Sequence, residues 1–411
     1  MMRWVFMLIM ATVFSTCWAR GETTKSLPIL IWYGPPPSEN VREEMNIIRQ
    51  AGFNRVLFNG WSADVNRQLL EYGDAIGIEL YITDETIHQF CLNPETGFRR
   101  LDSLTLNYLR HPSFRGYLLF EKPSLGDFKS FVEVVDFISG KYTQLDYFIQ
   151  GHPIYAPPAR LDTSRYDIYL SMFVDKLKPK FISIEYSAFD NNTLRLEILQ
   201  NLQILSEMSR TKRIPFWAFV LLNPIGQPPT VPHSYIRVQV YTALAYGARG
   251  IQYYAFHESG SNSEFPTAAV MNPEEQISQT FLNCAVVNSE LKKLEPVLMN
   301  LESLGVFSSK PVPPGGTPLT PGLAINKIDA AGMLVGFFKD QNDHDYVLLV
   351  NTDFLLGKKC RVYFSSAVLE LVEVAKDELS VQRFTPQSDK SGNTLELLFK
   401  AGDGRLFRII D

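Results

Sequence analysis

A short apolar run followed by an amphipathic segment recurs eight times between residues 27 and 301, and this alternation limits the fold more than any other feature. The runs are rich in β-branched and aromatic residues and end at turn-forming residues, which is typical of buried strands joined by helices. They span residues 27–33, 53–59, 77–83, 116–121, 145–150, 181–186, 215–222 and 250–256. Eight strand and helix units over this length predict an α/β fold of the (β/α)8, or TIM, barrel type.

A doubly wound open sheet is the alternative fold for alternating strands and helices. Such a sheet would favour a glycine-rich phosphate-binding turn after the first strand. Here that turn is Gly34 followed by three prolines, 35–37, which have no backbone N–H to donate to a phosphate. The sequence therefore favours the barrel and gives no sign of a dinucleotide or any other cofactor.

The composition changes after the last predicted helix. Residues 307–322 are rich in proline and glycine, which predicts a linker. Short alternating strands separated by turn residues follow, which is typical of a small antiparallel β-sandwich. We therefore expect a barrel over residues 27–306, a linker over 307–322 and a β-sandwich domain over 323–411.

The N-terminus has the pattern of a secretory signal peptide. Arg3 precedes an apolar segment, 4–14, and small residues end at Ala19, so we expect residues 1–19 to be removed. Lipid attachment at Cys17 is the less favoured alternative, because the residues before it, 14–16, are a poor match to a lipoprotein signal. The protein is expected to be exported, to the periplasm or the extracellular space, with no integral membrane segment after cleavage.

Charge and cysteine content exclude several classes of protein. The net charge of −5 leaves no basic excess for binding nucleic acid. The cysteines that remain after signal cleavage, Cys91, Cys284 and Cys360, are far apart and odd in number, so we interpret them as buried free thiols. The six histidines show no paired metal-ligand spacing, and no metal site is predicted.

The fourth apolar run ends in the charged pair Glu121 and Lys122, followed by Pro123. In a barrel the carboxyl ends of the strands form the mouth, where barrel enzymes place their catalytic groups. These charges are therefore the first candidates for a site. The alternative interpretation is that they only mark where a core strand meets water.

Four stretches together resemble exported bacterial glycoside hydrolases with a family-42-like barrel of clan A, the β-galactosidase-like enzymes. They are residues 31–36, 116–123, 241–254 and 401–408, and their order and spacing extend over nearly all of the mature chain. The resemblance implies hydrolysis of glycosidic bonds by two carboxyl groups, with an acid/base after the fourth strand and a nucleophile after the seventh.

The chain departs from that pattern at both positions. Many relatives have Asp-Glu-Pro where this chain has Glu121, Lys122 and Pro123, so a lysine stands at the expected acid/base position. Successive strand residues face opposite ways, and a one-residue bulge before Pro123 would be needed to turn Glu121 into the mouth. The seventh strand is followed by Asn223, with no carboxylate.

Other carboxylates lie at predicted strand ends. Glu185 ends the sixth strand and Glu258 follows the eighth. The catalytic candidates are therefore Glu121, Glu185 and Glu258, with Glu121 as the acid/base and Glu185 or Glu258 as its partner. Asp84 and Glu85 end the third strand and are further candidates near the mouth.

A second set of residues near strand ends has the aromatic or polar character that suits binding of a sugar ring and its hydroxyl groups. The predicted substrate-binding residues are Trp32, Tyr33, Asn59, Trp61, Asp84, Lys122, Tyr186, Trp217, Tyr254 and His257. For the aromatic members, packing in the barrel core is the alternative interpretation.

Two functions follow from these observations. The first is a glycoside hydrolase that cleaves O-glycosidic bonds of an extracytoplasmic oligosaccharide or polysaccharide. The second is a carbohydrate-binding relative that has lost the acid/base, which Lys122 and the carboxylate-free seventh strand favour.

Overall fold

The computed structural model describes residues 26–84, 87, 94–190, 193–222, 231–256, 277–377, 381–389 and 392–411. The predicted signal peptide with Cys17, and also Glu85, Cys91, His257 and Glu258, lie outside the described residues.

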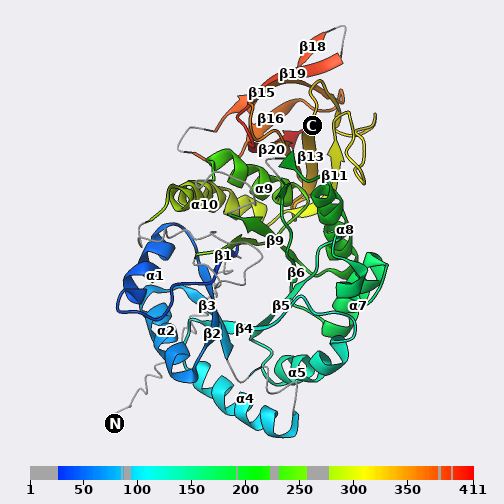
Figure 1. The fold of residues 1–411 in the computed structure, drawn as a ribbon. Coiled ribbons are helices and arrows are strands. Elements are labelled where there is room, and N and C mark those ends of the chain that lie inside the picture. Colours follow the sequence, from blue (N-terminus) through cyan, green and yellow to red (C-terminus); the bar gives the residue numbers. More distant parts are fainter. Residues whose placement is uncertain are drawn as a thin grey trace, which may run out of the picture.

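The first part of the chain forms a closed barrel of eight parallel strands, in the order β1-β10-β9-β6-β5-β4-β3-β2 (Figure 1). Each apolar run that predicted a strand forms one, which confirms the predicted fold. The strands are β1 (Ile29–Trp32), β2 (Arg55–Trp61), β3 (Glu79–Asp84), β4 (Phe114–Glu121), β5 (Asp146–Gly151), β6 (Ile182–Ile184), β9 (Phe216–Leu221) and β10 (Ile251–Tyr254).

Helices surround this barrel because each predicted amphipathic segment buries its apolar stripe against the outer side of the strands. They are α1 (Val41–Gln50), α2 (Ala63–Ile76), α4 (Pro94–Tyr108), α5 (Phe128–Lys141), α6 (Pro158–Leu161), α7 (Tyr166–Leu177), α8 (Leu196–Lys212), α9 (His233–Ala245) and α10 (Gln279–Leu298). A two-stranded hairpin, β7 (Phe189–Asp190) and β8 (Thr193–Leu194), lies between β6 and α8.

Aromatic side chains fill the barrel interior below the mouth. The ring of Phe148 on β5 contacts Trp32 on β1 and Trp217 on β9 at centroid distances of 5.3 and 6.1 Å. The indole nitrogen of Trp32 donates to Gln252 Oε1 at 3.1 Å, and Gln252 Nε2 donates to Ser183 Oγ at 2.9 Å. This packed layer closes the barrel beneath the strand ends, so any site must lie above it.

The C-terminal part is an antiparallel β-sandwich with its own apolar core. One sheet has the order β11-β13-β14-β20-β16-β17 and the other β12-β15-β19-β18. The strands are β11 (Glu302–Ser308), β12 (Ile325–Ile328), β13 (Met333–Lys339), β14 (Asp345–Asn351), β15 (Lys358–Phe364), β16 (Glu370–Glu373), β17 (Arg383–Phe384), β18 (Gln387–Asp389), β19 (Gly392–Phe399) and β20 (Gly404–Ile410).

The domain boundary differs from the predicted one. Strand β11 pairs with β13, so the sandwich begins at Glu302 and not after residue 322. Residues 309–322 form a loop within this domain, since Pro318 makes a β-bridge with Ser308. The proline and glycine content that suggested a linker between domains belongs to a connection between β11 and β12.

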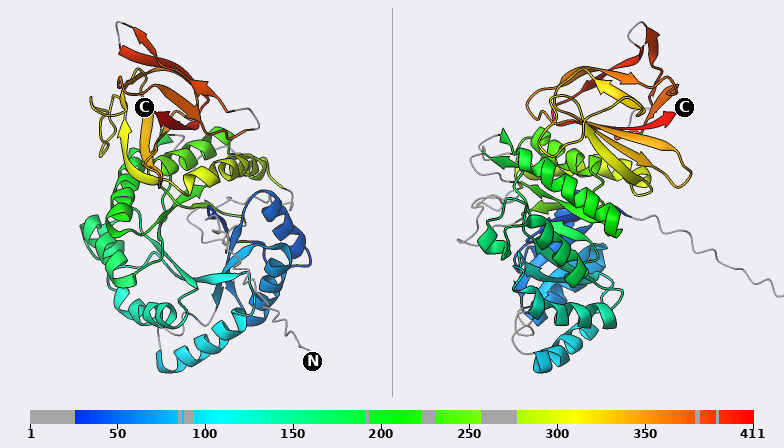
Figure 2. Two further views of the ribbon diagram at one scale, coloured as in Figure 1. Left: turned by 180° about the vertical axis from the view of Figure 1, so that it is seen from behind. Right: turned by 90° about the vertical axis from the view of Figure 1, so that its right-hand side faces the viewer.

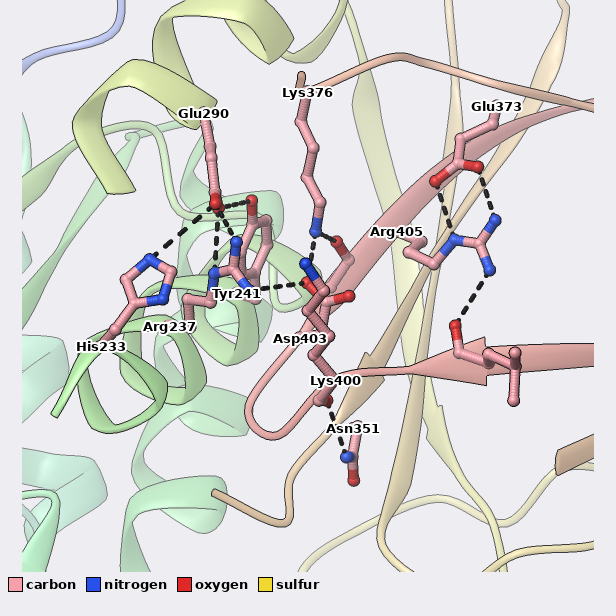
Figure 3. Close-up of polar contacts among 12 residues, drawn as sticks. His233, Arg237, Tyr241, Glu290, Asn351, Glu373, Lys376, Lys400, Asp403 and Arg405 are labelled. Atoms are coloured by element: carbon pink, nitrogen blue, oxygen red, sulfur yellow. Dashed lines mark hydrogen bonds and ion pairs between the residues drawn. The ribbon is translucent and has the colours of Figure 1, made fainter. Parts of the chain in front are cut away.

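The sandwich packs on α9 at one side of the barrel, and its first strand, β11, contacts α8 (Figures 1 and 2). A largely buried polar network joins the two parts (Figure 3). Arg237 on α9 forms an ion pair with Glu290 on α10, and Tyr241 donates to the same carboxylate at 2.8 Å. Arg237 also lies 3.8 Å from Asp403 in the β19 to β20 turn, and Asp403 forms an ion pair with Lys376. The network fixes the sandwich against the helices that precede and follow strand β10.

Two of the predicted free thiols can be assigned. Cys284 and Cys360 are buried and unpaired, which confirms that part of the interpretation. None of the helices in the described ranges is long and apolar enough to cross a membrane.

Candidate functional site at the barrel mouth

A β-bulge in β4 determines where Glu121 points. Tyr117 and Phe120 both face outward, where Tyr117 contacts α4 and Phe120 stacks on α5. In a regular strand the side chains alternate between the two faces, so Tyr117 and Phe120, three positions apart, would point to opposite faces. The pairing of β4 with β5 shifts between Leu118 and Phe120, which inserts one extra residue. Glu121 therefore faces the barrel axis.

Glu121 reaches across the mouth to the end of β1. The hydroxyl of Tyr33 donates to Glu121 Oε2 at 3.4 Å, although β1 and β4 are not neighbours in the barrel. The ring of Tyr33 lies 5.2 Å from that of Tyr254, at the end of β10. Burial, followed by the negative charge of Glu121, raises the pKa of Tyr33 well above its ordinary value, so this hydroxyl remains a donor.

Lys122 and Glu185 form an ion pair beside Glu121. Lys122 Nζ lies 2.8 Å from Glu185 Oε1, and the two side chains are 24% and 10% exposed. Glu185 directly follows β6, and its backbone N–H donates to the carbonyl of Gly151 at 3.3 Å. The structure thus brings Glu121, Lys122 and Glu185 together at the ends of β4 and β6.

The backbone is strained at two of these residues. Tyr33 and Lys122 both have φ of 51°, in the left-handed region that side chains other than glycine rarely occupy. The Lys122 N–H donates to the carbonyl of Gln150 at 2.7 Å, which holds this conformation. Strained residues of this kind cluster at functional sites, because the surrounding structure must stabilise them.

The electrostatics favour the protonated form of Glu121. Burial and the negative charge of Glu185 raise the pKa of Glu121, while Lys122 and the Tyr33 hydroxyl lower it to a smaller extent. The Glu121 side chain is exposed at the open mouth, so the pKa is raised by the walls that surround the carboxyl group and not by removal of the residue from solvent. Glu185, in contrast, has a cation in direct contact. Two carboxyl groups in such different environments can divide the roles of acid and base.

Strand β9 contributes no carboxylate to the mouth within the described residues. Its last residue, Leu221, is followed by the buried Leu222, whose N–H donates to the carbonyl of Tyr254 at 2.9 Å. Asn223 lies outside the described residues. Among the described residues, the carboxylate beside Glu121 is that of Glu185, which directly follows β6.

Four predicted substrate-binding residues lie away from the open mouth. Trp32 is fully buried in the interior layer, and Tyr186 is also buried with its hydroxyl bonded to the backbone of Phe219. Trp217 lies near the N-terminal end of β9 and stacks on Phe181, at the face opposite the mouth. These three aromatic residues are buried in the core and do not line the open mouth.

Asp84 is the fourth predicted substrate-binding residue that lies away from the mouth. Its carboxylate accepts a hydrogen bond from Tyr108 of α4 at 2.9 Å and is 2% exposed. Since Tyr108 lies outside the barrel, Asp84 faces the helix layer, away from the axis. Its role is to join β3 to α4.

The remaining predicted residues are in different situations. Tyr33, Lys122 and Tyr254 lie at the mouth beside Glu121. Trp61 is half-buried at the end of β2. Asn59 lies on β2 with its side chain outside the described part, and His257 and Glu258 are outside it altogether, so their predicted roles stay predictions.

A cavity of about 170 Å³ opens beside the ion pair and was missed by sequence reasoning. Besides Lys122 and Glu185, its walls include His152, Tyr155, Arg160 and Arg195. His152 and Tyr155 come from the loop after β5, Arg160 from α6, and Arg195 from the position between β8 and α8. Their position after a barrel strand was the signal that could have identified them, since loops at this face carry the functional residues of the fold.

Within the described ranges, no cluster of three or more histidine, cysteine, aspartate or glutamate side chains could hold a metal ion.

Comparison with solved structures identifies glycoside hydrolases with this barrel fold. A glycoside hydrolase family 5 protein from Bacteroides vulgatus ATCC 8482 is 10% identical with a TM-score of 0.60, covering 94% of this chain and 89% of that one. An α-amylase from Geobacillus thermoleovorans is 10% identical with a TM-score of 0.53, covering 94% and 98%. A β-galactosidase from the psychrophilic Marinomonas ef1 is 11% identical with a TM-score of 0.51, covering 68% and 63%.

At these identities the likeness shows a shared fold. No protein-family model and no curated protein matches the sequence. The class defined so far is a (β/α)8 barrel with a C-terminal β-sandwich, a fold that known glycoside hydrolases share.

Proposed function

We propose that the protein is a glycoside hydrolase in which Glu121 is the general acid and Glu185 is its partner carboxylate. The observation that carries the proposal is the pair itself. Two carboxyl groups meet at the barrel mouth, one with a raised pKa and one beside a lysine. Glycoside hydrolysis requires such a pair, one protonated and one charged.

The proposed reaction assigns one step to each residue. Glu121 gives its proton to the glycosidic oxygen as the bond from that oxygen to the anomeric carbon breaks. Glu185 either attacks the anomeric carbon or removes a proton from the attacking water, and its distance from Glu121 decides which. Water supplies the hydroxyl of the released sugar in both cases. Tyr33 stabilises the Glu121 carboxylate after proton transfer, since its hydroxyl donates to that oxygen.

The substrate is proposed to be an oligosaccharide or polysaccharide outside the cytoplasm. The signal-like segment at residues 1–19 supports export of the chain. The aromatic rings of Tyr33 and Tyr254 at the mouth offer an apolar face to a sugar ring.

A carbohydrate-binding protein without hydrolytic activity is the second candidate, and one observation favours it. The direct contact of Lys122 with Glu185 stabilises the Glu185 carboxylate and opposes its use as a nucleophile. In this case the mouth binds a sugar and leaves the glycosidic bond intact.

Release of reducing sugar from a broad glycan panel tests the proposal. The parent is compared with Glu121→Gln, Glu185→Gln and the control Glu133→Gln, which changes an exposed glutamate on α5. We expect turnover by the parent and the control, and a loss of about 100-fold or more in each mouth variant. No turnover by the parent, with sugar binding still measurable, would instead support the second candidate.

A further inference from the structure

The cavity beside Glu185 is lined mainly by positively charged side chains, although the chain as a whole is acidic. Its walls carry three cationic side chains, Lys122, Arg160 and Arg195, and a single carboxylate, Glu185. The whole chain has a net charge of −5. A locally basic cavity on an acidic protein favours a negatively charged ligand.

The cavity is continuous with the proposed catalytic pair. Glu185 belongs to both, and Lys122, which forms an ion pair with it, also lines the cavity, so a group bound there lies next to the proposed position of the glycosidic bond. Its volume of about 170 Å³ is that of several water molecules, at about 30 Å³ each in the liquid, and suits one charged substituent of a sugar.

Part of the wall is already ordered for binding. Tyr155 accepts a hydrogen bond from the Ser187 N–H at 2.6 Å, and the guanidinium of Arg195 lies 5.2 Å from the centre of the Tyr155 ring. Arg195 is also held through its backbone, whose N–H donates to the carbonyl of Ala188 at 3.0 Å. Side chains fixed in this way lose less conformational entropy when a ligand binds.

Arginine is suited to the groups that distinguish acidic sugars. Its planar guanidinium carries five N–H donors in a fork that matches a carboxylate or a sulfate. An arginine that keeps a partner within the protein still has donors for a ligand. A neutral sugar has only hydroxyl groups at the same positions and gains no charge-assisted hydrogen bonds.

We propose that the sugar recognised at the mouth is acidic, with a uronate carboxylate or a sulfate ester that binds in the cavity formed by Lys122, Arg160 and Arg195. This inference deepens the proposed hydrolase function and rests on it for the position of the cleaved bond.

Matched aryl glycosides test the inference. Glucoside is compared with glucuronide, galactoside with galacturonide, and each neutral glycoside with its 6-sulfated form, so that each pair differs at one substituent. We expect a higher kcat/KM for the acidic member of a pair than for its neutral counterpart. Whether the uronides or the 6-sulfated glycosides have the higher kcat/KM identifies the acidic group that the cavity binds.

The arginines are tested by the ratio of acidic to neutral kcat/KM. In Arg160→Gln and Arg195→Gln this ratio should fall by about 10- to 100-fold, as expected for loss of a charge-assisted hydrogen bond. The control Arg42→Gln changes an exposed arginine on α1 and should leave the ratio unchanged. Thermal melts verify that each variant is folded.

The outcomes separate the two proposals. Preference for neutral sugars, or a ratio that both arginine variants leave unchanged, would overturn the acidic substrate while keeping the hydrolase. If no glycoside is cleaved, the hydrolase proposal fails, and calorimetric titration with glucuronate, galacturonate, sulfated glucose and neutral glucose decides the inference. Binding of an acidic sugar that Arg160→Gln weakens would then support it, and equal or no binding would overturn it.

Discussion

Replacing Lys122 with methionine should destabilise the protein, because it leaves the Glu185 carboxylate largely buried without its cation. The pair is 2.8 Å apart, with 24% and 10% of the side chains exposed. Losing one partner of a fully buried pair costs about 3–5 kcal/mol, and an exposed pair contributes about 0–1 kcal/mol. We expect an intermediate loss of about 1–3 kcal/mol in the free energy of unfolding.

This loss corresponds to a small shift in melting temperature. The chain has 411 residues. At an unfolding entropy of about 2 cal/mol/K per residue, Tm should fall by about 1–4 °C. Urea unfolding measures the free energy directly. The double variant Lys122→Met with Glu185→Leu should regain stability, since it removes the uncompensated charge.

The same variant should also change the pH dependence of activity. Lys122 lowers the pKa of Glu121, so its removal raises that pKa further. Glu121 acts as an acid only when protonated, and the fall in kcat/KM at high pH should therefore move to higher pH. Titration of the Glu121 carboxyl by ¹³C NMR follows the same shift without turnover. A variant as stable as the parent, or a shift to lower pH, would refute the reasoning about this ion pair.

Two further predictions concern the contact between the domains. Burial and the charge of Arg237 lower the pKa of His233 below its ordinary value of 6.5. Below about pH 6.5, His233 is therefore protonated in the unfolded chain but still neutral in the native protein. The free energy of unfolding falls as the pH decreases from about 6.5 to the native pKa of His233. In His233→Gln the midpoint of urea unfolding should depend less on pH over this range. An unchanged pH dependence would contradict the lowered pKa of His233. Gly402→Ala should lower the free energy of unfolding by about 2–4 kcal/mol, because φ is +66° and the new Cβ would lie 2.3 Å from the carbonyl oxygen of Ser234. The control Gly140→Ala has open space around its Cβ and should be neutral or slightly stabilising, and equal effects of the two changes would count against this interface.

The fold could be predicted from the sequence because hydrophobic periodicity reports burial directly. All eight barrel strands were found from their apolar runs. The boundary of the sandwich was misplaced, since β11 looks like the end of the barrel until its pairing with β13 is known. Pairing between distant strands leaves no local signal in the residues of one strand.

The site was predictable only in part. Glu121, Lys122 and Glu185 were found because they stand at strand ends, which a barrel brings together. The direction of Glu121 depends on a bulge in β4, which periodicity does not reveal. Trp217 was wrongly predicted to bind substrate, because its aromatic character was given more weight than its position near the N-terminal end of β9, which lies opposite the mouth.

The central claim is that Glu121 is the catalytic acid, and one comparison tests it most directly. The kcat/KM of Glu121→Gln is measured on a glycoside with a poor alkyl leaving group and on the matched 2,4-dinitrophenyl glycoside, which needs no proton. We expect a loss of about 10²- to 10⁴-fold on the first and little loss on the second. Equal losses on both substrates, or no loss on either, would contradict the assignment of Glu121 as the acid.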